Sequence, residues 1–428
     1  MTTTKNNEHK ELYFSSEREQ SQVCLNSAEH EKNQGRKVLN VPILRFKEFQ
    51  GEWEKMRLDA FTRRVMRKNK SNQSRLPLTI SAQYGLVDQI TFFNKVIAST
   101  DMSNYYLLKK GEFAYNKSYS SDYPWGAIKR LDNYEQGALS SLYICFTPQD
   151  NVESDFILQY FESPKWHKGV SEIAVEGARN HGLLNVSVQD FFHTYHYVPK
   201  DKKEQIKIAK LLMLLDERIT TQNKIIEDLK RLKSAIIEKE YSNKTKNFSH
   251  LGDFIEQISK RNKDRAIHNV LSVSNSQGFI QQSEQFENRI VASDDTSNYK
   301  IVERNHFAFN PARINVGSIA RLITFEKGIV SPMYICFRTK DSLFPEYLGY
   351  YFESKQFFIE IQKRLEGSVR QCLSFEGLCN IPLSIPMVEV QQQIGKRLSA
   401  LVQKIKLETD FLELLQKQKK FLLQQMFI

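Results

Sequence analysis

The feature that most constrains the fold is an internal repeat. Residues 99–116 and 293–310 align without a gap, and eight of the eighteen positions are identical. The match continues downstream, where the Tyr-Ile-Cys-Phe sequence at 143–146 recurs at 334–337. Each copy is too long to be one unit of a solenoid. The sequence therefore predicts two tandem homologous modules.

Each module begins with a globular part, near 56–198 in module 1 and near 249–386 in module 2. Short aromatic and β-branched runs, such as 142–146 and 333–337, alternate there with Gly, Asn, Ser and Pro. This pattern predicts a mixed α/β globule with several short strands.

A heptad pattern follows each globular part. Residues 204–240 contain no Pro or Gly, and apolar residues recur at alternating steps of four and three, interrupted by Gln222 and Lys233. Adding 186 to each number gives a second seam, with Glu408 and Lys419 at the interruptions. The predicted helix-pairing seams are Ile208, Leu212, Leu215, Ile219, Ile226, Leu229 and Ile236, and Ile394, Leu398, Leu401, Ile405, Leu412, Leu415 and Leu422.

Each seam predicts a helix of about 35 residues, roughly 50 Å long, which is not stable alone in water. The nearest partner is the other copy, so we expect an α+β protein whose two long helices pair as an antiparallel, pseudo-twofold coiled coil. The alternative is that each helix packs only on its own globule. The expected divisions are a mobile N-terminal tail at 1–40, a first domain at 41–199, a central helix at 200–246, a second domain at 247–387 and a C-terminal helix at 388–428.

Composition narrows the class of protein. Lys and Arg total 61 against 50 Asp and Glu, a net charge of +11 that favours an acidic partner such as nucleic acid. The five cysteines are sparse and odd in number, which argues against a disulfide framework and favours a reducing, cytoplasmic location. No apolar run approaches the roughly 18 residues that cross a bilayer, so no membrane partner is expected.

Motifs for catalysis are missing from the sequence. We find no phosphate-binding loop and no dinucleotide fingerprint, and Asn310-Pro311-Ala312-Arg313 only partly matches the Asn-Pro-Pro-aromatic signature of amino-methyltransferases. The spacings of Cys372 and Cys379, and of His193 and His196, fit no metal site. We therefore expect no catalytic residue, no metal and no cofactor bound by this chain.

Three kinds of segment could contact nucleic acid. Residues 57–75 hold seven cations and one acid, with a shorter counterpart at 260–265. The loop 117–126 mixes cations, hydroxyls and aromatics, whereas its counterpart 311–317 is shorter and chemically different, so that two loops on one scaffold would read two sequences. The third segments are 176–182 and 366–371. The predicted DNA-binding residues are Arg67, Lys68, Lys70, Lys117, Tyr119, Lys129, Arg130, Arg179, His181, Arg261, Lys263, Arg313, Arg321 and Arg370.

Two variable globules, each followed by a heptad helix, resemble the specificity subunit of type I restriction-modification enzymes. The opening pattern of that family is similar to Pro42-Ile43-Leu44-Arg45-Phe46 and Gly51-Glu52-Trp53, and its junction is similar to Glu204-Gln205 through Asp216. The second junction departs from the pattern, because Val390 and Val402 stand where Glu204 and Asp216 stand in the first.

The resemblance implies two target-recognition domains that bind a bipartite, asymmetric duplex DNA target, one half-site per domain. It also implies two modification subunits that use S-adenosylmethionine to methylate adenine, and restriction subunits that use ATP and Mg²⁺ for translocation and cleavage. The chain itself would be a non-catalytic specificity subunit. The competing hypotheses are a stand-alone methyltransferase or nuclease with an unrecognised active site, a coiled-coil scaffold, and an RNA-binding protein.

Overall fold

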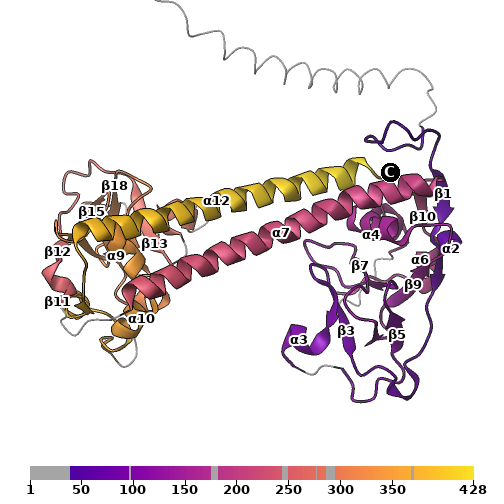
Figure 1. Cartoon of the computed structure of the whole chain (residues 1–428), viewed down its shortest axis with the longest axis horizontal. Helices are drawn as coiled ribbons and strands as arrows, with labels where there is room; N and C mark the ends of the chain where they lie inside the picture. The colour runs from indigo at the N-terminus through magenta and orange to yellow at the C-terminus, as the bar shows by residue number, and fades with distance from the viewer. Residues whose placement is uncertain are drawn as a thin grey trace, which may run out of the picture. The chain divides into compact units, whose positions relative to one another are not determined.

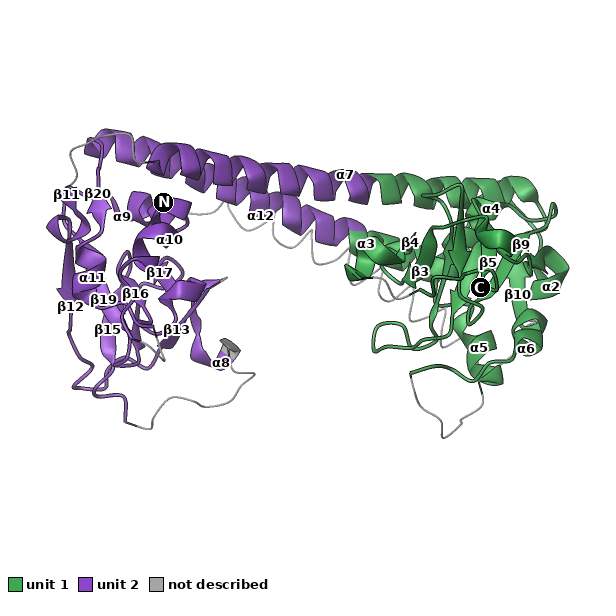
Figure 2. Cartoon of the chain, turned by 90° about the horizontal axis from the view of Figure 1, so that it is seen from below, with its two compact units in different colours: residues 1–217, 416–428 green, residues 218–415 purple. Residues whose placement is uncertain are grey.

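The computed structural model describes residues 39–95, 98–174, 182–242, 249–275, 277–285, 295–367 and 371–428. The chain divides into two compact units: unit 1 comprises the residues up to Glu217 together with 416–428, and unit 2 comprises 218–415. Both boundaries fall inside long helices, so each unit contains a piece of both helices (Figure 2). The predicted tail lies outside the described residues except for Leu39 and Asn40, and the Asn40 side chain donates to Glu52.

Unit 1 contains two four-stranded sheets and a two-stranded ribbon. The first sheet is antiparallel, in the order β2 (Thr62–Arg64), β9 (Ile144–Pro148), β6 (Phe113–Asn116) and β7 (Ala127–Arg130). The second has the order β4 (Gly85–Asp88), β3 (Pro77–Ser81), β8 (Gln136–Leu139) and β5 (Tyr106–Lys109), with β3 and β8 parallel. The ribbon pairs β1 (Glu54–Arg57) with β10 (Tyr195–Val198).

Helices cover the first sheet of unit 1. The most buried is α4 (Ser154–Glu162), where Phe156, Ile157, Tyr160 and Phe161 recur at helical spacing and pack into the core beside the stacked rings of β6 and β9. The remaining short helices are α2 (Leu58–Phe61), η1 (Lys70–Asn72), α3 (Gln89–Phe93), α5 (His167–Ile173) and α6 (Val188–His193).

Unit 2 repeats this strand order. Its first sheet has the order β12 (Ile255–Ile258), β19 (Ile335–Thr339), β16 (Phe307–Phe309) and β17 (Ile319–Arg321). Its second has the order β14 (Gly278–Gln281), β13 (Val270–Ser274), β18 (Lys327–Val330) and β15 (Lys300–Glu303), again with the middle pair parallel. Figure 1 labels β12, β13, β15 and β18 among the strands of this unit. The ribbon pairs β11 (Ser249–His250) with β20 (Pro382–Leu383), and the short helices are η2 (Leu251–Asp253), α8 (Gln282–Gln285), η3 (Ile314–Val316), α9 (Pro345–Tyr351), α10 (Lys355–Gln362) and α11 (Phe375–Cys379).

The predicted duplication of mixed α/β globules is thus confirmed. The strands expected at 142–146 and 333–337 begin later, at Ile144 and Ile335. The difference has a local cause, because Tyr143 and Tyr334 donate their backbone N–H groups to Ser140 and Ser331 and close a turn before each strand.

The two long helices are α7 (Lys202–Tyr241) and α12 (Val388–Gln425). All fourteen predicted seam residues are buried or half-buried, whereas several apolar residues outside the seam, among them Leu214, Leu232 and Leu414, are exposed. In unit 1, α7 lies against α4 through buried Ile208 and Leu212, and in unit 2, α12 packs on its globule through Ile394 and Leu398.

The helices also pair with each other, and the pairing is antiparallel. In unit 2 the Arg218 guanidinium lies 5.3 Å from the Phe411 ring centroid, and the Gln222 amide donates to the Glu408 backbone carbonyl at 3.0 Å. Gln222 and Glu408 are the polar interruptions that the repeat makes equivalent. Equivalent positions that contact each other are expected when two copies of one helix pair about a twofold axis, so the contact agrees with the predicted pseudo-twofold coiled coil.

Candidate nucleic-acid interface

In each module the loop of the second predicted segment contacts the chain at or just after the end of the third segment, where the structure describes it. In module 1 the N–H of Tyr119 donates to the Gly182 carbonyl at 3.0 Å, and the N–H of Leu184 donates to the Lys117 carbonyl at 2.9 Å. In module 2 the N–H of Leu373 donates to the Pro311 carbonyl at 3.1 Å. The loops after β6 and β16 therefore each contact a second loop that is far away in the sequence.

A glycine fixes the end of each loop. Gly126 and Gly317 have φ of +78° and +88°, in the left-handed region that favours glycine. At Gly126 an added Cβ would also lie 2.1 Å from the Asn116 carbonyl oxygen. The strand before the loop and the glycine at its end are thus common to both modules, but the enclosed loop segments differ in length and chemistry.

The two loops expose different side chains. Tyr119 in module 1 is 46% exposed. Lys117 is half-buried, and its Nζ lies 3.4 Å from the Val186 carbonyl oxygen. In module 2 the single turn η3 occupies the loop, and Arg313, which precedes this turn, is exposed.

The predicted strand cations are engaged within their own modules. Arg130 on β7 lies 2.7 Å from a carboxylate oxygen of Asp155, in the first turn of α4, and Arg321 on β17 lies 3.4 Å from Glu346, in the first turn of α9. Lys129 lies 2.6 Å from Glu162. These ion pairs link each first sheet to the helix that covers it, so truncating these cations would also remove a contact within the module.

The basic segments pack along the second sheets instead. Arg67 forms a bidentate ion pair with Glu112, and Lys68 donates to the Asn104 carbonyl and lies over the Tyr106 ring. Lys70 is exposed. The counterparts in module 2 are Arg261, which donates to Asn298, and Lys263, which is exposed.

Three predicted residues, Arg179, His181 and Arg370, lie outside the described residues. The structure adds cations that the predicted set did not include, because Arg63, Arg64 and Arg75 are exposed while Arg67 and Lys68 are held. Their only signal in the sequence was membership of the basic cluster.

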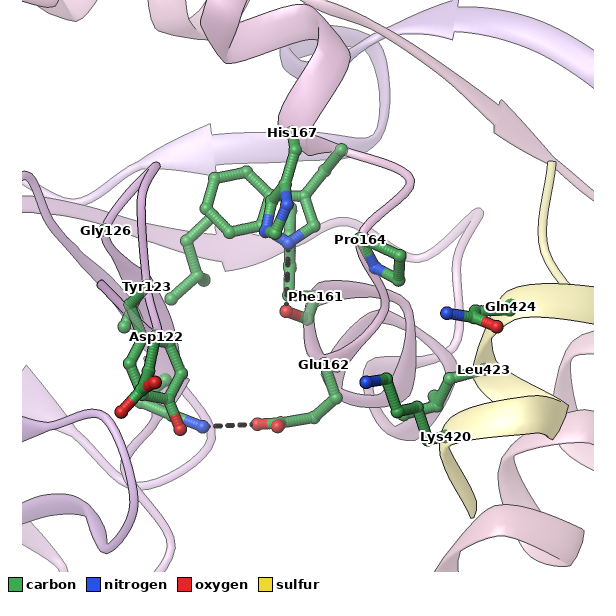
Figure 3. Close-up of a pocket in the computed structure, with 14 residues that line it drawn as sticks. Asp122, Tyr123, Gly126, Phe161, Glu162, Pro164, His167, Lys420, Leu423 and Gln424 are labelled. Atoms are coloured by element: carbon green, nitrogen blue, oxygen red, sulfur yellow. Dashed lines mark hydrogen bonds and ion pairs between the residues drawn. The ribbon is translucent and has the colours of Figure 1, made fainter. Parts of the chain in front are cut away.

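A cavity of about 270 Å³ opens in unit 1 beside the Lys129–Glu162 ion pair (Figure 3). Trp166 and His167 line one wall, and Lys420 of α12 lines another. Burial lowers the pKa of His167 below its ordinary value, so this imidazole is neutral near pH 7. Within the described part of the chain, no group of three His, Cys, Asp or Glu side chains is placed to hold a metal ion.

Residues 236–417 match a family model described as the type I restriction modification DNA specificity domain. This part of the chain is therefore similar to a type I restriction-modification DNA specificity domain. The matched segment covers module 2 with the end of α7 and most of α12. The resemblance drawn from the sequence is confirmed, and specificity domains of this family generally act as non-catalytic recognition subunits.

Solved structures extend the likeness of the specificity fold to nearly the whole chain. The crystal structure of the type I restriction-modification S subunit from M. genitalium has a TM-score of 0.53 at 15% identity, covering 91% of this chain and 99% of that one. A structure described in work on complex assembly and conformational transition of the type I R-M system has a TM-score of 0.52 at 13% identity, covering 87% of this chain and 96% of that one. At these identities the likeness shows the fold. No curated protein matches the chain.

None of the helices that the structure describes is long and apolar enough to cross a membrane. The family match thus concerns residues 236–417, and the structural likeness shows the fold of nearly the whole chain.

Proposed function

We propose that this chain binds a bipartite, asymmetric duplex DNA target, one half-site per module, and directs adenine methylation or cleavage by partner subunits. The matched specificity family supports DNA recognition, and the duplication supports two half-sites.

One observation carries the proposal: two modules with the same strand order present different side chains on equivalent loops. The loop ends at Gly126 in module 1 and Gly317 in module 2, but the exposed loop side chains include Tyr119 in one and Arg313 in the other. A tyrosine and an arginine offer different hydrogen-bond patterns to base edges. Such a pair favours an asymmetric target over a palindromic one.

The paired helices would set the spacing between the half-sites. A heptad seam resists bending and stretching, so its length would be a fixed spacer between the two modules. Half-sites separated by about one turn of B-DNA, roughly 34 Å, present the same face to a reader.

The chemistry is proposed to reside on partner subunits. Two modification subunits would supply S-adenosylmethionine-dependent methylation, and restriction subunits would supply ATP- and Mg²⁺-dependent translocation and cleavage. The absence of nucleotide-binding and amino-methyltransferase motifs from the full sequence supports a chain without catalysis of its own.

Module exchange tests the proposal. Residues 56–198 are replaced by the equivalent segment of another specificity subunit, and a matched chimera exchanges 249–386. Methylated adenines are then mapped by single-molecule sequencing, with the gene deletion as the baseline. We expect each chimera to change one half of the methylated sequence and to keep the other. An unchanged target in both chimeras would contradict modular recognition.

Two loop variants refine the test, because their side chains are exposed and away from the ion pairs that tie sheet to helix. We expect Tyr119→Ala and Arg313→Ala each to weaken binding to one half-site by about 1–3 kcal/mol, as for loss of a good base contact. Purified chain incubated with DNA, Mg²⁺, ATP and S-adenosylmethionine should show no turnover until the partner subunits are added; turnover by the chain alone would favour a stand-alone enzyme.

A further inference from the structure

The two modules share one loop frame in their basic segments. Asn69 and Asn262 are completely buried, and each forms a pair of side-chain hydrogen bonds with the backbone five residues later, at Ser74 and Ile267. The backbone N–H groups of both asparagines donate to equivalent tyrosine carbonyls at 3.0 Å or less. The loops 69–74 and 262–267 are therefore held in equivalent positions.

The chain entering each frame is also equivalent. It leaves the edge strand β2 or β12 and then runs beside the start of β5 or β15, where the carbonyls of Arg67 and Lys260 each accept a backbone N–H at 2.8 Å. Segment 62–75 of module 1 thus corresponds, residue by residue, to segment 255–268 of module 2.

The charges on this shared frame differ. Segment 62–75 contains six cations and no acid, whereas segment 255–268 contains four cations and two acids. At the edge strands, the positions of Arg63 and Arg64 in module 1 are occupied by Glu256 and Gln257 in module 2.

The charges are also paired differently. Within the described part of the chain, four cations of module 1 are exposed and form no ion pair or side-chain hydrogen bond: Arg63, Arg64, Lys70 and Arg75. In module 2, Glu256 pairs with Arg338, and Arg265 lies 3.2 Å from Asp295. Among the cations of segment 255–268, all of which are described, only Lys260 and Lys263 are exposed and form no ion pair or side-chain hydrogen bond.

We propose that segment 62–75 is a phosphate-binding surface, and that module 1 therefore supplies a larger share of the electrostatic affinity for duplex DNA than module 2. The proposal rests on the proposed DNA-binding function and adds an inequality between the two half-sites. Each phosphate that a cation neutralises releases counterions and steepens the salt dependence of binding by about 0.9 in log K against log salt. Unpaired cations are the ones free to do so without losing an intramolecular partner.

Protection of a sheet edge is a competing explanation for Arg63 and Arg64, because charges on an edge strand prevent strand pairing between molecules. It does not apply to Lys70 and Arg75, which follow the strand in the buried-asparagine frame. The two pairs of cations are therefore tested separately and together.

The experiment measures binding of the full chain to a labelled duplex by fluorescence anisotropy between about 50 and 200 mM salt. We expect Arg63→Gln, Arg64→Gln, Lys70→Gln and Arg75→Gln together to lower the slope by roughly 3.6, and Lys70→Gln with Arg75→Gln by roughly 1.8. Lys260→Gln with Lys263→Gln should lower it by at most about 1.8.

The matched control is Lys203→Gln with Lys210→Gln, which removes two exposed cations of α7 in the same unit and should leave the slope unchanged. The proposal is overturned if the Lys70/Arg75 double variant has the same salt slope as the control variant. It is also overturned if the four-residue variant of module 1 and the Lys260/Lys263 variant of module 2 lower the slope by the same amount. Tryptophan fluorescence verifies folding of unit 1, because Trp53, Trp125 and Trp166 all lie there. If the unmodified chain shows no salt-dependent binding to duplex DNA, the proposed function itself fails.

Discussion

Modules 1 and 2 share the aromatic packing of their interior but differ in some of their buried polar contacts. The rings of Phe113 and Phe146 stack at 5.4 Å and 9° in module 1, and those of Phe307 and Phe337 stack at 5.1 Å and 10° in module 2. Behind these matching rings, the hydrogen bonds that link the ribbon to the covering helix are different.

In module 1 buried His196 lies between two hydroxyls, with Nδ1 2.8 Å from Tyr160 Oη and Nε2 2.7 Å from Thr194 Oγ1. In module 2 the ribbon register places Leu383 where His196 lies in module 1. The equivalent hydroxyl of Tyr351 is buried without a hydrogen-bond partner among the described residues.

A second difference concerns the start of the long helices. Buried Glu204 accepts two hydrogen bonds from Arg45, at 2.7 and 2.8 Å, and one from the Trp53 indole at 3.2 Å. In α12 the equivalent residue is half-buried Val390. The following glutamine is the same in both helices. Gln205 and Gln391 each donate to a proline carbonyl and accept from the N–H of the residue that precedes α4 or α9.

The comparison teaches that the ring packing and the glutamine bridge are kept in both modules, whereas the contacts of His196 and Glu204 are found in module 1 alone among the described residues. These differences provide contrasts in which one module serves as the control for the other.

The largest expected effect is at Glu204. Glu204→Ala leaves the guanidinium of Arg45 partly buried and without its carboxylate, so we expect unit 1 to lose about 3–5 kcal/mol of unfolding free energy. Val390→Ala in α12 should cost only about 0.5–1.5 kcal/mol. Urea unfolding measures both variants, with tryptophan fluorescence as the signal for Glu204→Ala and far-UV circular dichroism as the signal for Val390→Ala. Similar losses of unfolding free energy would show that the Glu204 contacts contribute little.

The next effect is the pH dependence that His196 contributes, since Leu383 takes its place in module 2. Burial lowers the pKa of His196 from 6.5 to about 3, so the unfolded chain binds a proton between these values that the folded chain does not. The stability of unit 1 should therefore fall as pH falls below 6.5, by about 2 kcal/mol at pH 5.

His196→Gln isolates this contribution, because it removes the titrating group. The difference in unfolding free energy between the unmodified chain and the variant should change by that amount between pH 8 and pH 5. A difference that is the same at both pH values would contradict a buried neutral histidine.

A smaller contrast concerns the two tyrosines. Tyr160→Phe removes a partner of His196 and should cost about 1–2 kcal/mol, whereas Tyr351→Phe removes a hydroxyl without a partner among the described residues and should be neutral or stabilising. Chemical unfolding of each variant measures both effects. Equal costs would indicate that Tyr351 has a partner, such as a bound water.

The smallest expected effect concerns the cavities beside the first sheets. Lys129 lines the cavity of about 270 Å³ in module 1, and Ala320 at the equivalent position lines a cavity of about 570 Å³ in module 2. Because Glu162 is partly exposed, Lys129→Ala should cost no more than about 1 kcal/mol. Ala320→Lys should be tolerated, since the larger cavity has room for the side chain; a loss above about 3 kcal/mol would show that it does not.

The fold was largely predictable because its signals are local or repeated. A long stretch without Gly or Pro and a heptad period mark α7, and the repeat transfers that assignment to α12 despite Gly395. The parallel pairing of β3 with β8 had no such signal, because the residues that pair are about sixty positions apart in the sequence.

The candidate interface was predictable only as a set of segments. Arg67 and Lys70 look alike in the sequence, but Glu112, 45 positions from Arg67, pairs with one and not the other. Likewise, the contact between the loops at Tyr119 and Gly182 joins distant parts of the chain. Which cations remain available to a ligand depends on tertiary contacts that no local pattern records.

The last turn of α12 has a consequence for how the protein is made. Leu423, Met426 and Phe427 belong to the core of unit 1, where the Phe427 ring lies 5.5 Å from that of Phe156, and the Leu44 N–H donates to the Gln425 carbonyl. A ribosome must therefore translate all of unit 2 before unit 1 receives its final apolar side chains. The half of the protein that is synthesised first is the half that is completed last, and its unfilled core must stay protected on the nascent chain until then.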